Sequence, residues 1–213
     1  MAQRELIVGV SGASGALLAR RFVELVLPAK EISRLHLILT EASLKVAASE
    51  IDPGILSAED WVAGLSPPEK THRRKVVLHS NDDLGASIAS GSYPTGGMIV
   101  IPCSAGTLGA IAQGISRDLL QRAADVCLKE RRPLVLAFRE SPYSLVHIEN
   151  MRRVTAAGAI VAPPLPAFYI SSPSVERTLD AFCVRAARHL SLELPDASFR
   201  WTGGATKKRG RRR

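Results

Sequence analysis

Short apolar runs recur along this chain, and a segment with helical periodicity follows most of them. Unbroken runs of about 4–8 apolar residues, rich in Val, Ile and Leu, are typical of strands that are buried on both faces. The predicted strands are 5–10, 35–40, 75–80, 96–102, 132–138 and 159–163. The predicted helices are 16–27, 41–50, 58–65, 103–115, 117–132, 144–158 and 174–192. This alternation predicts an α/β fold with three layers, in which helices cover both faces of a mostly parallel central sheet.

The positive charge of the chain is concentrated at its C-terminus. The formal net charge is +8, and six positive charges come from Lys207, Lys208, Arg209, Arg211, Arg212 and Arg213. Blocks of like charge are usually solvated and disordered. We therefore expect a single domain over residues 1–202 and a basic, disordered tail over 203–213. Contact of this tail with a phosphate-rich or acidic partner is the alternative, and nucleic-acid binding by the domain is not expected.

Several functional classes are disfavoured by what the sequence lacks. No apolar stretch approaches the roughly 18–20 residues that span a bilayer, and the N-terminus leads straight into a predicted strand, so we expect a cytoplasmic protein. The three cysteines, Cys103, Cys127 and Cys183, are far apart, and the five histidines show no ligand spacing. We expect reduced thiols and no metal site.

Three predicted strands end in loops whose residues suit ligand binding. They are SGASG at 11–15, PCSAGTLGAIAQG at 102–114 and RESPYS at 139–144. In parallel sheets, ligands bind beyond the carboxyl ends of the strands, where helix N-termini present free N–H groups. The first loop lacks the spacing of a dinucleotide fingerprint, so a plain turn in which Ser14 caps the next helix is an equal alternative.

The second loop carries the more specific pattern. Ser104 and Thr107 flank Ala105 and Gly106 at the start of a predicted helix, where hydroxyls and backbone amides together suit a phosphate or the edge of a flavin ring. Cys103 has no base near it in the sequence, so a small buried thiol is favoured over a nucleophile.

Taken together, four segments resemble the flavin prenyltransferase family. The segments are SGASG, ASGSYPTGGMIVIPCSAGTLGAIAQG, RAADVCLKERRPLVLAFRESPYSLVHIENM and PPLPAFY, and the resemblance extends from about Val8 to Trp201. It implies a Rossmann-like (flavodoxin-like) flavoprotein fold with one FMN-binding domain over 1–202. It also implies a large homo-oligomer, a dodecamer, with sites between subunits.

The resemblance assigns residues to both substrates. Those at the FMN are Gly12, Ala13, Ser14, Thr40, Ser104, Ala105, Gly106, Thr107 and Arg139. Those at the dimethylallyl phosphate are Ser90, Gly91, Arg122, Lys129, Glu140, Tyr169 and Arg185. The catalytic residues implied are Ser14, Glu50, Lys129, Glu140 and Trp201. Ser11 and Thr40 stand where the family usually has Thr and Ser, and both changes keep the hydroxyl.

The implied reaction joins a dimethylallyl group to N5 and C6 of reduced FMN without metal, and the product serves a decarboxylase of the UbiD type. Cationic side chains then replace magnesium at the departing phosphate, and either Glu50 or that phosphate takes the C6 proton. Two alternatives are an FMN-dependent decarboxylase of cysteinyl carboxylates, whose catalytic His and Asn–Met motif are missing here, and a non-catalytic flavin carrier.

Overall fold

The central sheet contains six strands, and all of them are parallel. The computed structural model describes residues 3–168 and 174–194. The strands are β1 (Arg4–Val10), β2 (Ile32–Leu39), β3 (Val76–His79), β4 (Met98–Cys103), β5 (Leu134–Phe138) and β6 (Ile160–Val161). Their order is β3-β2-β1-β4-β5-β6, with β1 and β4 side by side at the centre. This is the order of the doubly wound Rossmann fold, and it confirms the fold class predicted from the sequence.

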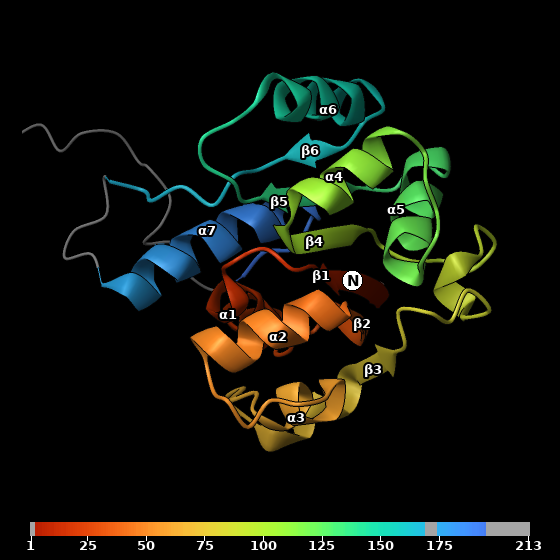
Figure 1. The fold of residues 1–213 in the computed structure, drawn as a ribbon. Coiled ribbons are helices and arrows are strands. Elements are labelled where there is room, and N and C mark those ends of the chain that lie inside the picture. The colour runs from red at the N-terminus through yellow and green to blue at the C-terminus, as the bar shows by residue number, and fades with distance from the viewer. Residues whose placement is uncertain (1–2, 169–173, 195–213) are drawn as a thin grey trace, which may run out of the picture.

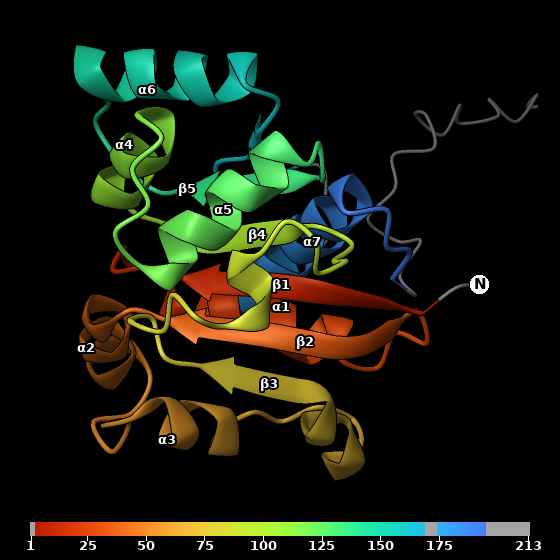
Figure 2. The ribbon, with the colours of Figure 1, turned by 90° about the vertical axis from the view of Figure 1, so that its right-hand side faces the viewer.

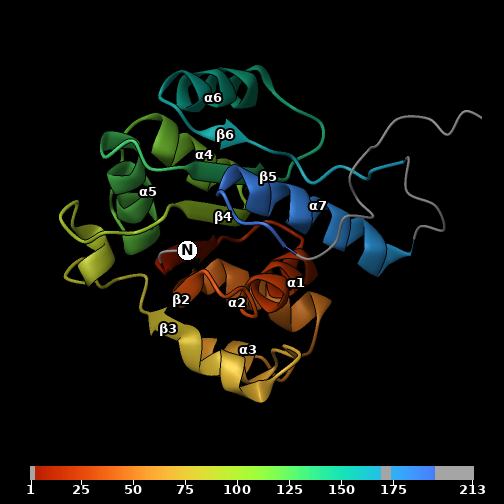
Figure 3. The same ribbon diagram turned by 180° about the vertical axis from the view of Figure 1, so that it is seen from behind.

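Helices cover both faces of the sheet (Figures 1 and 2). The α-helices are α1 (Ala16–Val26), α2 (Glu41–Glu50), α3 (Ala58–Ala63), α4 (Ala105–Ala112), α5 (Leu119–Lys129), α6 (Leu145–Ala156) and α7 (Val175–His189). Two short 3-10 helices, η1 (Lys70–Lys75) and η2 (Ser87–Ala89), flank β3 and were not predicted. In the view from behind, α7 lies across the sheet beside α1, far from its sequence neighbour α6 (Figure 3).

Side chains of each strand point alternately to the two faces of the sheet, and the core therefore forms two apolar clusters. In β1, Leu6, Val8 and Val10 pack with residues of α1 and α7, whereas Ile7 packs on the opposite face with residues of α4 and α5. Successive side chains of a strand point to opposite faces, so one strand feeds both clusters. Burial on both faces is the reason that the strands appear in the sequence as continuous apolar runs.

Side-chain caps mark several helix starts. Ser57 and Asp60 form a capping box at the start of α3, and Ser174 accepts a hydrogen bond from the Arg177 amide at the start of α7. Thr40 was predicted to end a strand, but it is the N-cap of α2, and its hydroxyl accepts a hydrogen bond from the backbone N–H of Ser43 at 3.1 Å. The Thr40 hydroxyl binds one of the first amides of α2, which have no partner within the helix. The strand therefore ends at Leu39, one residue before the predicted end.

The three cysteines are free and buried, as predicted. Burial in apolar surroundings raises the pKa of the Cys103 thiol far above its ordinary value, so this thiol is unreactive. In the described part of the chain, none of the helices has the length and apolar character needed to span a membrane.

Candidate functional site

Ser11 ties together the two glycine-containing loops at the carboxyl edge of the sheet, the edge where the strands end. Its hydroxyl donates a hydrogen bond to the carbonyl oxygen of Pro102 at 2.9 Å and accepts one from the backbone N–H of Ser104 at 2.8 Å. Its own amide also bonds to the Pro102 carbonyl at 3.2 Å. These bonds join the end of β1 to the end of β4, at the centre of the sheet where ligands of this fold bind.

The start of α1 is capped by a carboxylate from another helix. Glu50, the last residue of α2, accepts hydrogen bonds through Oε2 from the backbone N–H groups of Gly15 at 2.9 Å and Ala16 at 2.8 Å. The N-cap position itself is Gly15, which makes no side-chain cap. The alternative in which Ser14 caps this helix is therefore wrong. A negative charge is favourable here because the first amides of a helix carry partial positive charge.

The environment of Glu50 keeps its carboxyl group ionised. Partial burial by itself raises the pKa of Glu50, but hydrogen bonds from Ser14, Gly15 and Ala16 and the charge of Arg139 outweigh it. The net result is a pKa below the ordinary range for glutamate. Glu50 therefore links three predicted site elements: the first loop, the end of α2 and the end of β5.

Gly12 allows the first loop to approach α2 closely. A Cβ on Gly12 would lie 2.5 Å from the Cβ of Ala42, a separation that real carbon atoms do not adopt. The loop and Thr40 are also joined through the sheet, where the amide of Thr40 donates to the carbonyl of Val10 at 3.1 Å. Gly12, Ala13, Ser14 and Thr40 are thus neighbours at one edge of the sheet.

The first turn of α4 offers polar donors beside open space. Ser104 caps the helix by accepting a hydrogen bond from the Thr107 amide, and its hydroxyl donates to Thr107 Oγ1 at 3.0 Å. The first amides of a helix have no partner within it, so those of Ala105 and Gly106 are free to bind an acceptor. No heavy atom lies within 4 Å of a Cβ built on Gly106. Small residues, free amides and space fit the phosphate or ring edge of FMN.

The two charged residues that follow β5 lie at the same edge. Arg139 donates its amide to the carbonyl of Cys103 at 3.1 Å, which places it next to the second loop. Glu140 accepts the amide of Ser141 at 2.9 Å through Oε1, and its side chain is partly buried. We call this set of residues at the carboxyl edge the flavin cradle: Gly12, Ala13, Ser14, Thr40, Glu50, Ser104, Ala105, Gly106, Thr107 and Arg139.

Four residues predicted at the dimethylallyl phosphate form a separate group along α5. Arg122 donates through Nε to the carbonyl of Ala89 at 3.0 Å, just before Ser90. A Cβ on Gly91 would collide with the amino group of Lys129 at the other end of the helix. Because α5 runs from the carboxyl edge back toward the amino edge (Figure 2), Lys129 lies far along this helix from the cradle. We call Ser90, Gly91, Arg122 and Lys129 the α5 group.

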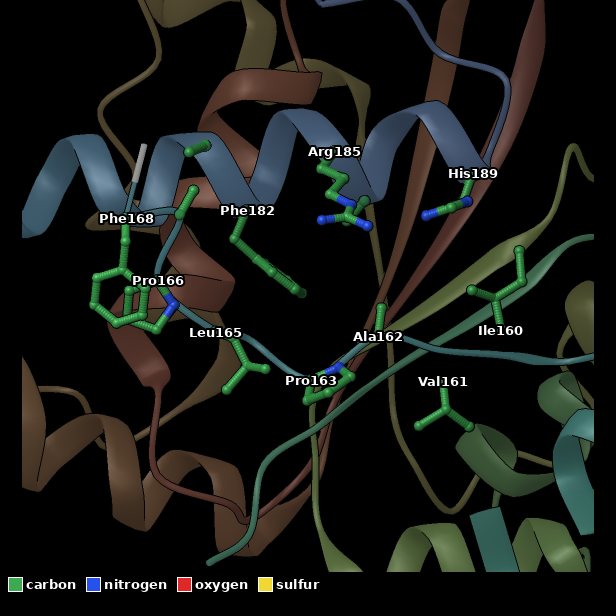
Figure 4. Close-up of a pocket in the computed structure, with 13 residues that line it drawn as sticks. Ile160, Val161, Ala162, Pro163, Leu165, Pro166, Phe168, Phe182, Arg185 and His189 are labelled. Carbon is green, nitrogen blue, oxygen red and sulfur yellow. The ribbon is translucent and has the colours of Figure 1, made fainter. Parts of the chain in front are cut away.

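Arg185 belongs to neither the flavin cradle nor the α5 group and lies on α7. It lines a cavity of about 940 Å³ between α7 and the segment that follows β6. Its guanidinium points into this cavity beside Phe182 and opposite Ala162 and Pro163 (Figure 4). An apolar cavity with a guanidinium suits a ligand that has an apolar part and an anionic part. Tyr169 and Trp201 lie outside the described residues.

No metal centre is found within 3–168 and 174–194, where no three His, Cys, Asp or Glu side chains are placed to hold an ion. Arg139, Arg122, Lys129 and Arg185 are the cations that the resemblance assigns to the two substrates. Arg139 follows β5, Arg122 and Lys129 lie on α5, and Arg185 lies on α7.

Comparison with known proteins shows the family of the chain. The flavoprotein family model matches residues 1–179. A curated relative from Synechocystis sp., the flavin prenyltransferase UbiX, is 41% identical over 203 residues, which cover 93% of this chain and 96% of the relative. This chain belongs to the flavin prenyltransferase family.

Solved structures of the family have the same fold. The crystal structure of AnUbiX (PadA1) in complex with FMN and dimethylallyl pyrophosphate is 36% identical, with a TM-score of 0.81 over 95% of this chain and 99% of that one. A dodecameric FMN-dependent UbiX-like decarboxylase from Escherichia coli O157:H7 is 37% identical, also with a TM-score of 0.81, over 93% of this chain and 100% of that one.

Sequence reasoning missed the bonds that build the cradle. Nothing local to Glu50 indicates that it caps α1, because the two segments are 35 residues apart. From the sequence we found no ligand spacing among the five histidines, and we did not detect that His36 and His79 join Glu5 and Tyr93 in one hydrogen-bonded series. A histidine inside an otherwise apolar strand was the available signal.

Proposed function

We propose that this protein is a flavin prenyltransferase that transfers the dimethylallyl group of dimethylallyl phosphate to N5 and C6 of reduced FMN. The observation that carries the proposal is the flavin cradle, whose loops are joined by Ser11 and by Glu50 at the edge where this fold binds ligands. Membership of the family supports it, as does a solved relative that binds FMN and dimethylallyl pyrophosphate.

The cradle residues would hold FMN, with the free amides of the first turn of α4 and the hydroxyls of Ser104 and Thr107 as its donors. Reduced FMN supplies the nucleophilic atoms of the reaction. Ser14, which hydrogen-bonds to Glu50, would orient the flavin from the first loop. The packing of Gly12 against Ala42 fixes that loop, so little reorganisation is needed on binding.

We further propose that the α5 group and Arg185 complete the site from neighbouring copies of the chain. Within one copy these residues lie along α5 and on α7, away from the cradle. A homo-oligomer of this chain would bring them to the cradle of another copy, and a solved relative is described as a dodecamer. Each phosphate site would then use residues of more than one subunit.

The proposed reaction needs no metal, because side-chain cations would stabilise the charge that develops on the departing phosphate. Arg122, Lys129 and Arg185 supply that charge, and Arg139 lies at the cradle itself. Such preorganised groups lower a barrier by about 2.7–4 kcal/mol each in acyl-transfer enzymes, which gives the scale expected here. Tyr169 and, in its protonated form, Glu140 would donate hydrogen bonds to the phosphate, and Trp201 would face the allylic cation.

The lowered pKa of Glu50 bears on which group takes the proton from C6. A base weakens as its pKa falls, and Glu50 is held below the ordinary value of glutamate. The group that departs is inorganic phosphate, whose dianion accepts a proton at a pKa closer to neutral than that of a glutamate. We therefore assign the C6 proton to the departing phosphate, and we assign to Glu50 the roles of fixing Ser14 and the start of α1.

The product would pass to a decarboxylase of the UbiD type in the cytoplasm. A transferase of this kind makes a modified cofactor that it does not itself use, so a recipient enzyme is required. The basic residues 207–213 have no part in this proposal.

The decisive test is the mass of the flavin after reaction. Protein treated with chelator is incubated anaerobically with reduced FMN and dimethylallyl phosphate, and the flavin is analysed by mass spectrometry. We expect a gain of one dimethylallyl group without added metal. An unchanged flavin would refute the transferase, and a gain that depends on added magnesium would refute the metal-free mechanism.

A paired variant tests the role of Glu140. Glu140→Gln should lower transfer by about 100-fold or more while FMN still binds, since it changes only a group assigned to the phosphate. Glu149→Gln is the matched control, because Glu149 is an exposed acid on α6 that pairs with Arg152. Loss of FMN binding in Glu140→Gln would show that the assigned role is wrong.

A further inference from the structure

A chain of polar side chains crosses three strands on the face of the sheet that α5 covers. The hydroxyl of Tyr93 donates to Glu5 Oε2 at 2.5 Å, and the same oxygen lies 2.8 Å from His36 Nε2. His36 Nδ1 lies 2.8 Å from Nε2 of His79, and the two rings are stacked. His36 is 2% exposed and the Glu5 side chain is 22% exposed, so these bonds are partly shielded from water.

The geometry of these hydrogen-bonded side chains determines which of them donate and which accept. A carboxylate only accepts, so His36 Nε2 must carry a proton and donate it to Glu5. Burial by itself raises the pKa of Glu5, but the hydrogen bonds from Tyr93 and His36 and the charges of His36 and Arg34 lower it below the ordinary range. The bond from Tyr93 is therefore charge-assisted, which makes it about twice as strong as a neutral one.

Tyr93 belongs to the segment 90–95, which we call the Ser90 loop. The guanidinium of Arg132 holds the backbone of the same loop, donating to the carbonyl of Gly91 at 2.6 Å and to that of Tyr93 at 2.8 Å. It also donates to the hydroxyl of Thr95 at 3.2 Å. The loop is thus held by two side chains, the carboxylate of Glu5 on β1 and the guanidinium of Arg132, two residues before β5.

The Ser90 loop carries Ser90 and Gly91, which the proposed function assigns to the phosphate of the prenyl donor. A phosphate site depends on backbone amides and hydroxyls that are held in place before the ligand arrives. Neither Glu5 nor Arg132 lies in the flavin cradle or the α5 group. Their side-chain hydrogen bonds go to the loop and, for Glu5, also to His36 and Arg34.

We propose that Glu5, Tyr93 and Arg132 are positioning residues for the prenyl donor, which fix the Ser90 loop and so set the affinity for dimethylallyl phosphate. This inference rests on the proposed function. It assigns these three residues no contact with the flavin or with the reacting atoms, so their loss should affect donor binding and leave FMN binding and the chemical step largely unchanged.

Tyr93→Phe is the sharpest variant, since it removes only the hydroxyl and keeps the ring that packs at the edge of His36. We expect the KM for dimethylallyl phosphate to rise about tenfold, as loss of a charge-assisted hydrogen bond would give. We expect kcat to change less than about twofold and FMN affinity to stay the same. Arg34→Gln is the matched control, because Arg34 contacts the same carboxylate at 3.5 Å but does not contact the loop.

A double-mutant cycle tests whether Glu5 acts through Tyr93. Glu5→Ala should raise KM as Tyr93→Phe does, and the double variant should be no worse than Glu5→Ala alone. Glu5→Gln keeps an acceptor oxygen and should restore part of the donor affinity. Additive effects of the two single variants would overturn the proposed link.

Hydrogen exchange of amides 90–95 in substrate-free protein provides a readout that needs no activity. We expect faster exchange in Tyr93→Phe and unchanged exchange in Arg34→Gln. Faster exchange with an unchanged KM overturns this inference and leaves the proposed function intact. A parallel fall in kcat, FMN affinity and Tm shows a merely structural role and also overturns it. Wild-type protein that transfers no prenyl group overturns the proposed function, and this inference with it.

Discussion

The flavin cradle and the α5 group differ in how completely one copy of the chain builds them. In the cradle, loops that follow β1 and β4 are joined by Ser11, and Glu50 ties the first loop to α2. In the α5 group, Arg122 pairs with Asp125 in the next turn, and Lys129 pairs with the adjacent Glu130. A single chain thus preorganises the proposed flavin site, whereas Arg122 and Lys129, proposed for the phosphate, are paired with nearby carboxylates.

The largest effect is expected from the α5 group. Lys129→Gln removes a cation assigned to the departing phosphate, and turnover should fall about 100- to 1,000-fold with FMN affinity unchanged. Steady-state kinetics and a flavin titration check both quantities. Lys45→Gln is the control, because Lys45 is an exposed lysine that also pairs with a glutamate of its own helix. A loss of FMN binding in Lys129→Gln would contradict the separation of the two groups.

A change in the cradle should instead lower the affinity for FMN. Ser11→Ala leaves the Ser104 amide and the Pro102 carbonyl without their side-chain partner, which costs about 1–3 kcal/mol. FMN affinity should fall about tenfold, as measured by fluorescence titration. Ser33→Ala deletes a comparable bond from Ser33 to the carbonyl of Arg4, outside the site, and should leave FMN affinity unchanged. Equal losses of FMN affinity in the two variants would show that Ser11 has no special role in FMN binding.

Mixed assemblies test whether the two groups meet between subunits. Oligomers formed from Lys129→Gln and Ser11→Ala chains contain sites with an intact cradle from one copy and an intact lysine from another. Such mixtures should recover part of the activity that each variant lacks alone. No recovery, in oligomers shown to contain both chains, would mean that cradle and lysine act within one copy.

A smaller effect, on stability, is expected from Glu50. Glu50→Gln removes the negative charge at the start of α1, which should lower the free energy of unfolding by about 0.3–1 kcal/mol at neutral pH. Because the pKa of Glu50 is lower in the folded protein, its contribution is complete above the unfolded value of about 4.3 and is lost as pH falls through the folded value.

Urea unfolding of wild type and Glu50→Gln between pH 7 and pH 3 measures this contribution. The difference between the two should be constant near neutral pH and should shrink toward pH 3. Glu59→Gln, which changes an acidic residue in the first turn of α3, serves as the control. A difference that grows on acidification would contradict the sign of the shift.

The smallest effect is expected from the tail. Removal of residues 207–213 takes away six cations outside the cradle and the α5 group. Turnover, KM and FMN affinity should all stay within experimental error of the full chain. A large loss of turnover would show that the basic residues take part in the reaction or in assembly.

Much of the fold was predictable because its signals are local. Each strand of the described sheet was found to within a few residues, since strands buried on both faces appear as apolar runs. Helix ends were less certain: α4 stops at Ala112, where the chain turns through Gly114 at positive φ, and α5 starts only after the Asp118 cap. Local apolar periodicity continues across both boundaries and therefore did not reveal them.

The sequence by itself determined the α/β class, the strand ends that carry polar loops and, through resemblance, the residues assigned to each substrate. Only the tertiary structure decided that Glu50 caps α1, that Ser11 joins loops 91 to 93 residues apart, and that the cradle and the α5 group are separate. The physical reason is that such contacts depend on strand order and register. Strand order and register bring together side chains that are far apart in the sequence, and the residues around each of them do not indicate the contact.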